Sequence, residues 1–138
     1  MHSGPTVLAN VGGGQHRGST YQVLPHSILD DGLLDVCVIG SEVAPVNVPE
    51  LTRTGAHLTR PGVVYARGRV ITVERTDGHP ISLEHDGEFL TGSTTRMTTR
   101  VLPTALRVLC LAGNDSFGAR PHIMTAESTL TGASHLPQ

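Results

Sequence analysis

Two clusters of acidic residues hold the side chains whose types and spacing could do chemistry. The first is the segment Asp30-Asp31-Gly32-Leu33-Leu34-Asp35, in which three carboxylates surround an Asp-Gly dipeptide. Carboxylates and free backbone carbonyls are the oxygen ligands that Mg²⁺ and Ca²⁺ prefer, although this spacing is not that of an EF-hand. An Asp-Gly dipeptide is also typical of a plain turn with solvated acids around it. The local pattern leaves a metal site and a turn as alternatives.

The second cluster is the segment Glu84-His85-Asp86-Gly87-Glu88. If the strand before it continues, alternation places Glu84 and Asp86 on one face and His85 on the other. Neighbouring carboxylates can have their pKa values pushed apart, which makes one of them a candidate general base. The alternative is a turn at Asp86-Gly87 with charged residues on both sides.

Other chemistries are excluded by what the sequence lacks. All ten basic residues are Arg, so there is no Schiff-base lysine and no Walker A loop, which needs a lysine on the phosphates. The run Gly12-Gly13-Gly14 does not match a Rossmann fingerprint, because Arg17 stands where the third glycine should be. His79 and His85 are too few for a zinc site, which takes four ligands.

The distribution of charge also limits the possible partners. The arginines are scattered from Arg17 to Arg120 and are offset by twelve acidic residues, which gives a net charge of -2. The chain therefore has no basic stripe to neutralise phosphates, and at 3% aromatic residues it has few rings on which bases could stack. We expect no nucleic-acid partner.

The elements that must position the two clusters are short strands separated by turn residues. With 38% hydrophobic residues, 16 Gly and 9 Pro among 138 residues, the composition fits a single turn-rich domain. One helix is expected over residues 48–58, with Asn47 as its N-cap. Strands are expected at residues 6–9, 21–24, 33–39, 63–66, 69–74, 81–85, 96–101 and 105–111. The predicted fold class is mostly β, an antiparallel β-sandwich with one short helix.

One strand stands out as a central element of the sheet. Residues 34–39 are apolar on both alternating faces beyond Asp35, which predicts a strand covered on both sides. Cys37 and Cys110 lie within apolar runs, where we expect buried thiols in a reducing cytoplasm.

The patterned part of the sequence stops well before its last residue. Residues 1–113 are predicted to form the domain and residues 114–138 a disordered tail, because apolar periodicity is lost there. No apolar run approaches the ~20 residues that cross a bilayer. The first residues show no charged-then-apolar signal pattern.

The order of the motifs is more informative than any single motif. A Pro-x-x-x-x-Asp-Asp-Gly-Leu-Leu-Asp-Val segment begins at Pro25, an Asp-Gly-Glu follows at Asp86, and a Val-Leu-Pro-x-Ala-Leu ending begins at Val101. Over roughly residues 6–112 this order resembles the C-terminal domain of the bacterial diacylglycerol kinase family of lipid kinases, which are relatives of sphingosine and ceramide kinases. In that family this domain is a β-sandwich, and ATP and Mg²⁺ lie in the cleft between it and an N-terminal α/β domain.

The resemblance implies roles for residues in both acidic clusters. Asp86 or Glu88 is implied to be the general base that takes the proton of the lipid hydroxyl, and the choice between them stays open. A structural Mg²⁺ is implied at the Asp31 carboxylate, together with the backbone carbonyls of Ile28 and Leu33.

The resemblance also implies a function. We expect the lipid-substrate half of an ATP-dependent lipid kinase, which phosphorylates the hydroxyl of a diacylglycerol-like lipid. The family's Gly-Gly-Asp-Gly-Thr nucleotide motif does not occur in the sequence, so ATP with its Mg²⁺ is expected only with a nucleotide-binding kinase domain. That domain is on another chain or has been lost from this one, and this chain alone is expected to be inactive.

The expected partners and location follow from that function. A lipid substrate implies a cytoplasmic protein peripheral to the membrane, and a homo-oligomer is left open. The competing hypothesis is a non-catalytic binding or regulatory module that keeps the sandwich fold.

Overall fold

A computed structural model describes residues 1–90 and 92–109 of the chain. The described part is built mainly of strands, with one short α-helix and two 3₁₀ turns. The strands are β1 (Thr6–Gly12), β2 (Leu34–Gly40), β3 (Val63–Gly68), β4 (Val70–Glu74), β5 (Leu83–His85), β6 (Glu88–Leu90) and β7 (Arg96–Arg100). The helix is α1 (Val48–Arg53), and the 3₁₀ turns are Pro45–Asn47 and Ala56–Thr59.

The first layer is a three-stranded antiparallel sheet in the order β1-β2-β3. The predicted central strand is confirmed, because β2 pairs with β1 on one side and with β3 on the other. The residues of β2 with odd numbers, Asp35, Cys37 and Ile39, are fully buried, and Leu34, Val36 and Val38 between them are half-buried. This pattern is what a strand covered on both faces requires.

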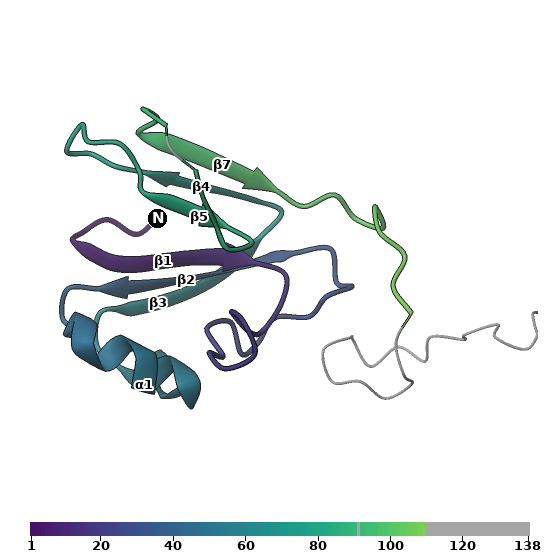
Figure 1. The fold of residues 1–138 in the computed structure, drawn as a ribbon, viewed down its shortest axis with the longest axis horizontal. Helices are drawn as coiled ribbons and strands as arrows, with labels where there is room; N and C mark the ends of the chain where they lie inside the picture. Colours follow the sequence, from purple (N-terminus) through teal and green to yellow (C-terminus); the bar gives the residue numbers. More distant parts are fainter. Residues whose placement is uncertain (91, 110–138) are drawn as a thin grey trace, which may run out of the picture.

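The second layer consists of two smaller antiparallel pairs, β4-β7 and β5-β6. In Figure 1, β4, β5 and β7 lie above β1, β2 and β3, and α1 covers the opposite side of the three-stranded sheet. Strands β4 and β7 alternate between exposed and half-buried residues, as strands with one solvated face do. The predicted fold class, mostly β with antiparallel sheets in a sandwich-like arrangement and one short helix, is confirmed.

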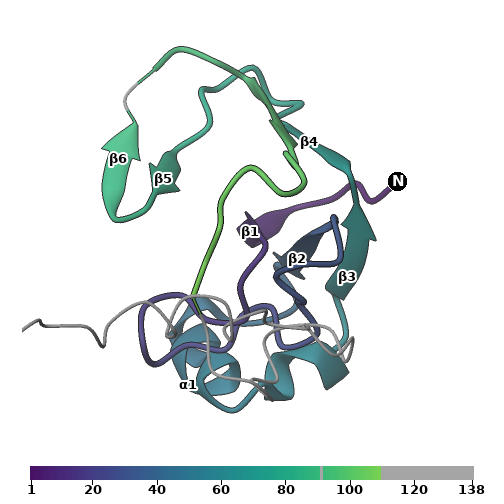
Figure 2. The same cartoon turned by 90° about the vertical axis from the view of Figure 1, so that its right-hand side faces the viewer.

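The hydrophobic core lies between the three-stranded sheet and α1. Among the described residues, the fully buried apolar side chains all lie within residues 23–43 and are Val23, Leu24, Cys37, Ile39 and Val43. In Figure 2, α1 lies below the three-stranded sheet. Its residues Val48 and Leu51 pack against this cluster. The second layer therefore adds no fully buried apolar residue to the core in the part of the chain that the structure describes.

The predicted helix over residues 48–58 is divided into two pieces. α1 ends at Arg53, and the 3₁₀ turn Ala56–Thr59 follows after Gly55, whose φ of 73° is left-handed. A residue in that conformation ends an α-helix. Asn47 precedes α1, but its side chain makes no capping hydrogen bond, because a 3₁₀ turn runs directly into the helix.

Two of the predicted strands are wrong. Residues 21–24 form no strand: the backbone N–H of Gln22 donates to Thr52 and that of Leu24 to Gln15, so this irregular segment is held by contacts outside any sheet. Residues 105–109 are exposed and irregular as well, and residues 110–111 of that predicted strand lie outside the described part. The predicted tail over residues 114–138 and Cys110 also lie outside it.

Candidate functional site

The second acidic cluster forms the tip of the β5–β6 hairpin. His85 pairs with Glu88, so that only Asp86 and Gly87 form the loop. Both loop residues have positive φ, 49° and 87°, as a two-residue hairpin turn of type I′ requires. The predicted turn at Asp86-Gly87 is therefore present, and the general-base role of the neighbouring carboxylates stays a prediction. The alternation that placed Asp86 and Glu84 on one face is wrong, because β5 ends at His85.

The hairpin presents its charged groups to solvent. The Asp86 side chain is 92% exposed, and its Oδ2 lies 3.9 Å from Nε2 of His85. Glu88 is also exposed, on the first position of β6. Glu84 forms an ion pair with Arg17, which joins the hairpin to the segment after β1. Two exposed carboxylates, those of Asp86 and Glu88, thus lie two positions apart at the tip of the hairpin.

Exposed apolar residues follow these carboxylates in the sequence. Phe89 and Leu90 follow Glu88 on β6 and are 74% and 50% exposed. Large apolar side chains that stay exposed next to polar groups mark a surface where another molecule can bind. The tip therefore combines proton acceptors with an apolar surface.

The first acidic cluster is held in a different way, by a buried network. Asp35 is fully buried at the start of β2, and its Oδ1 accepts a hydrogen bond from the Tyr65 hydroxyl over 2.7 Å. The same oxygen lies 3.1 Å from Nε of Arg67. Arg67 also forms an ion pair with Asp31, so one guanidinium joins two carboxylates of the cluster.

Tyr65 sits at the centre of this network. Its ring meets that of His26 edge-on, with the centroids 5.4 Å apart. Burial, and then the hydrogen bond to Asp35, raise the pKa of the Tyr65 hydroxyl above its ordinary value. A protonated phenol that donates to a buried carboxylate fixes β2 against β3, which is a structural rather than a catalytic arrangement.

The residues expected to bind Mg²⁺ can be tested against this geometry. Oδ1 of Asp31 accepts the backbone N–H of Leu33 over 2.9 Å, and Oδ2 pairs with Arg67. No group of three His, Cys, Asp or Glu side chains suited to a metal gathers among residues 1–90 and 92–109. As arranged, the Asp31 carboxylate does not fit a divalent ion, because a guanidinium already stands against it. The ligand set of Asp31, Ile28 and Leu33 stays a prediction.

Sequence reasoning found both acidic clusters but missed the partners of the first. Arg67 lies 36 positions after Asp31, and Tyr65 lies 30 positions after Asp35. Neither residue belongs to a local motif. The signal that identifies them is strand register: Asp35 pairs with Arg67 across β2 and β3, and Cys37 pairs with Tyr65. A register becomes visible only once the strands are aligned.

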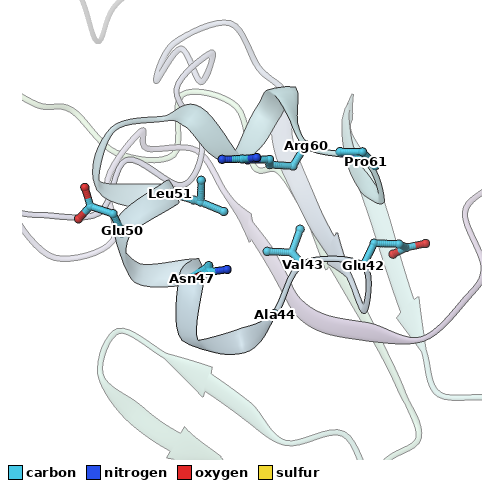
Figure 3. Close-up of a pocket in the computed structure, with 8 residues that line it drawn as sticks. All are labelled: Glu42, Val43, Ala44, Asn47, Glu50, Leu51, Arg60 and Pro61. Carbon is cyan, nitrogen blue, oxygen red and sulfur yellow. The ribbon is translucent and has the colours of Figure 1, made fainter.

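A shallow pocket lies elsewhere on the molecule, between the end of β2, α1 and the turn before β3. Figure 3 shows Glu42 and Glu50 towards its two ends, with Arg60 above Leu51 and Val43. None of the candidate catalytic or metal-binding residues lines it. Among the described residues, no helix is long and apolar enough to cross a membrane.

Comparison with known proteins identifies the fold family. The family described as "YegS C-terminal NAD kinase beta sandwich-like domain" matches residues 1–110. A protein of Pseudomonas fluorescens named "Probable lipid kinase YegS-like" is 33% identical over 109 residues, which are 76% of this chain and 34% of that protein. Proteins of the same name from Pseudomonas aeruginosa and Klebsiella pneumoniae are each 32% identical, over 80% and 75% of this chain.

The chain thus spans about a third of the length of the curated relatives that it matches. The resemblance to the C-terminal domain of a bacterial lipid kinase family, expected from the motif order, is confirmed. The family match covers most of the chain, and it includes both the Asp31 turn and the β5–β6 hairpin. The chain belongs to the family of the YegS C-terminal NAD kinase beta sandwich-like domain.

Proposed function

We propose that this chain is the lipid-substrate half of an ATP-dependent lipid kinase that phosphorylates the hydroxyl of a diacylglycerol-like lipid. Family membership supports the reaction class, because the curated relatives carry the name of probable lipid kinases. The observation that carries the proposal is the tip of the β5–β6 hairpin. There, the exposed carboxylates of Asp86 and Glu88 share one short hairpin with the exposed side chains of Phe89 and Leu90.

The chemistry of the hairpin tip suits a lipid alcohol. The hydroxyl oxygen attacks the γ-phosphorus of ATP, its O–H bond breaks, a new P–O bond forms, and ADP leaves with the bridging oxygen. A carboxylate of Asp86 or Glu88 accepts the hydroxyl proton. Phe89 and Leu90 offer apolar contact to the part of the lipid next to its hydroxyl, which keeps that group near the carboxylates.

The nucleotide is bound elsewhere in this proposal. ATP and its Mg²⁺ lie on a nucleotide-binding domain outside these 138 residues, which contain neither a Walker A loop nor the family's glycine-rich nucleotide motif. Bound Mg²⁺ neutralises the charge that develops on the transferred phosphoryl group. Alignment of donor and acceptor is most of the catalysis in phosphoryl transfer, so this chain alone is inactive. A lipid substrate places the protein in the cytoplasm, at the membrane surface.

A chimera tests the proposal. The 138-residue chain replaces the matching segment of the Pseudomonas fluorescens relative, and transfer of the ATP γ-phosphate to diacylglycerol in lipid vesicles is measured. Asp86→Asn and Glu88→Gln each remove one charge with little change in shape, and Asn tolerates the left-handed φ of 49° at position 86. The matched control is Glu74→Gln, an exposed carboxylate on β4.

We expect the chimera to phosphorylate the lipid and the chain alone to be inactive. Removal of the base lowers kcat about 10²–10⁴-fold, so the variant with this loss, Asp86→Asn or Glu88→Gln, identifies the base. The Glu74→Gln chimera keeps its rate. Full activity in both hairpin variants contradicts the assignment of the base. A folded but inactive chimera beside an active relative favours the alternative, a non-catalytic binding or regulatory module.

A further inference from the structure

Arg67 neutralises two acidic groups that belong to different parts of the fold. From β3, its Nε lies 3.1 Å from Oδ1 of Asp35, and its Nη2 pairs with Oδ2 of Asp31. The first of these carboxylates is fully buried in β2, and the second lies in the turn that leads into that strand. A guanidinium presents its donors in a rigid planar fork, so it can bridge two carboxylates in a way that an ammonium cannot.

Each oxygen of the Asp31 carboxylate already has one partner. Its Oδ1 accepts the backbone N–H of Leu33, which closes the turn, while its Oδ2 faces Arg67. The Asp31 side chain is only 20% exposed and that of Arg67 34%, so solvent screens the charges near them only in part. A divalent ion bound to this carboxylate would lie against the positive guanidinium, and the two charges would repel each other.

We propose that Arg67 is the resident cation of the Asp31 turn, and that Arg67 and a divalent cation are mutually exclusive occupants of the Asp31 carboxylate. The turn is then anchored to β3 by an internal ion pair and needs no metal to fold. This inference goes beyond the proposed kinase function and does not depend on it, because it concerns how the turn is held rather than which reaction takes place.

Thermal melting of the whole chain tests this inference. The melting midpoint is measured in millimolar MgCl₂ or CaCl₂ and in NaCl of matched ionic strength. An ion that binds only the folded state raises the midpoint. We expect no difference between the salts for the wild-type chain. Arg67→Met, which removes the charge and keeps an apolar stem, melts lower in NaCl and recovers by a few degrees in MgCl₂ or CaCl₂.

Three further variants separate this role from a general loss of stability. Arg67→Lys keeps a positive charge and stays insensitive to divalent ions. Asp31→Asn, added to Arg67→Met, abolishes the recovery because it removes the carboxylate. Arg75→Met is the matched control: it breaks the exposed pair between Arg75 and Asp77 and gains no response to the ions.

A second measurement covers the case in which Arg67→Met does not fold. Terbium, a luminescent substitute for Ca²⁺, emits when a nearby tyrosine is excited. Tyr65 can serve as this tyrosine, because its hydroxyl donates a hydrogen bond to Asp35 within this network. We expect no saturable emission from the wild-type chain. Emission that saturates and is lost in Asp31→Asn overturns the inference, as does a wild-type midpoint that rises in MgCl₂. A folded Arg67→Met variant without any divalent response overturns it too.

Discussion

His57 donates a hydrogen bond from Nε2 to the backbone carbonyl of Val23 over 3.0 Å. Both residues are fully buried, and they come from segments 34 positions apart. The bond therefore joins the 3₁₀ turn after α1 to the irregular segment that leads towards the Asp31 turn. This contact holds in place a segment that belongs to no strand. The His57 ring therefore supports the chain that leads to the first acidic cluster.

Replacement of His57 by Leu should destabilise the domain. The Val23 carbonyl would lose its donor while remaining buried, which costs about 1–3 kcal/mol of the free energy of unfolding. Urea unfolding followed by circular dichroism measures the change. His16→Leu, at an exposed position, is the control and should leave the free energy of unfolding nearly unchanged. Equal effects of the two variants would argue against a structural role for the buried bond.

Asp35→Asn should also be destabilising. It removes a buried negative charge that pairs with Arg67 and accepts the Tyr65 hydroxyl, so it leaves the guanidinium with only one of its two carboxylate partners. Because Arg67 is partly exposed, we expect a loss of about 2–4 kcal/mol, near the lower end of what breaking a buried pair costs. Glu50→Gln, which breaks the exposed pair with Arg53, should change urea stability very little. A comparable loss in both variants would show that the burial of Asp35 does not matter.

The stability of the chain should fall at high pH through Cys37. Burial raises the pKa of this thiol from 9.0 to about 11, so the folded state keeps a proton that the unfolded state loses. The contribution is fully present below pH 9 and is lost as the pH rises towards 11. The urea midpoint of the wild type should therefore fall more across this range than that of Cys37→Val. Parallel pH profiles for the two proteins would exclude this contribution.

Gly62 should be harder to replace than other glycines with the same backbone conformation. Gly62 and Gly78 have φ values of 76° and 77°. Backbone strain from Ala at either position lowers the free energy of unfolding by about 1–2 kcal/mol. A Cβ on Gly62 would also lie 3.0 Å from Cβ of Glu42, whereas nothing lies within 4 Å of one on Gly78. We expect Gly62→Ala to lose about 1–3 kcal/mol more than Gly78→Ala in urea unfolding. Equal losses would mean that the backbone near Glu42 yields easily.

Phe89→Ser should weaken association with lipid vesicles, if the hairpin tip contacts the lipid as proposed. The Phe89 side chain is 74% exposed on β6, and transfer of such a ring out of water stabilises binding by about 1.5–3 kcal/mol when complete. Cosedimentation with diacylglycerol-containing vesicles should fall roughly tenfold. Val46→Ser, an exposed apolar residue in the 3₁₀ turn before α1, is the control. Unchanged cosedimentation of Phe89→Ser would remove the hairpin from the lipid contact.

Local patterns in the sequence were sufficient for much of the fold. The apolar run through Cys37 predicts the central strand β2, since a strand covered on both faces must be apolar on both. The Asp86-Gly87 dipeptide predicts a turn, because its residues suit positive φ. Local patterns failed over residues 21–24, where apolar side chains enter the core from an irregular segment rather than from a strand.

The sequence by itself determined the two acidic clusters, the β-rich class and the resemblance to a lipid kinase family, because each depends on residue types at short spacing. Only the tertiary structure decided what the carboxylates do. Strand register brings Arg67 against Asp35 and Asp31, while the hairpin turn leaves Asp86 in solvent. The physical reason is that the state of a charge depends on its burial and its partners, and these come from strands that are far apart along the chain.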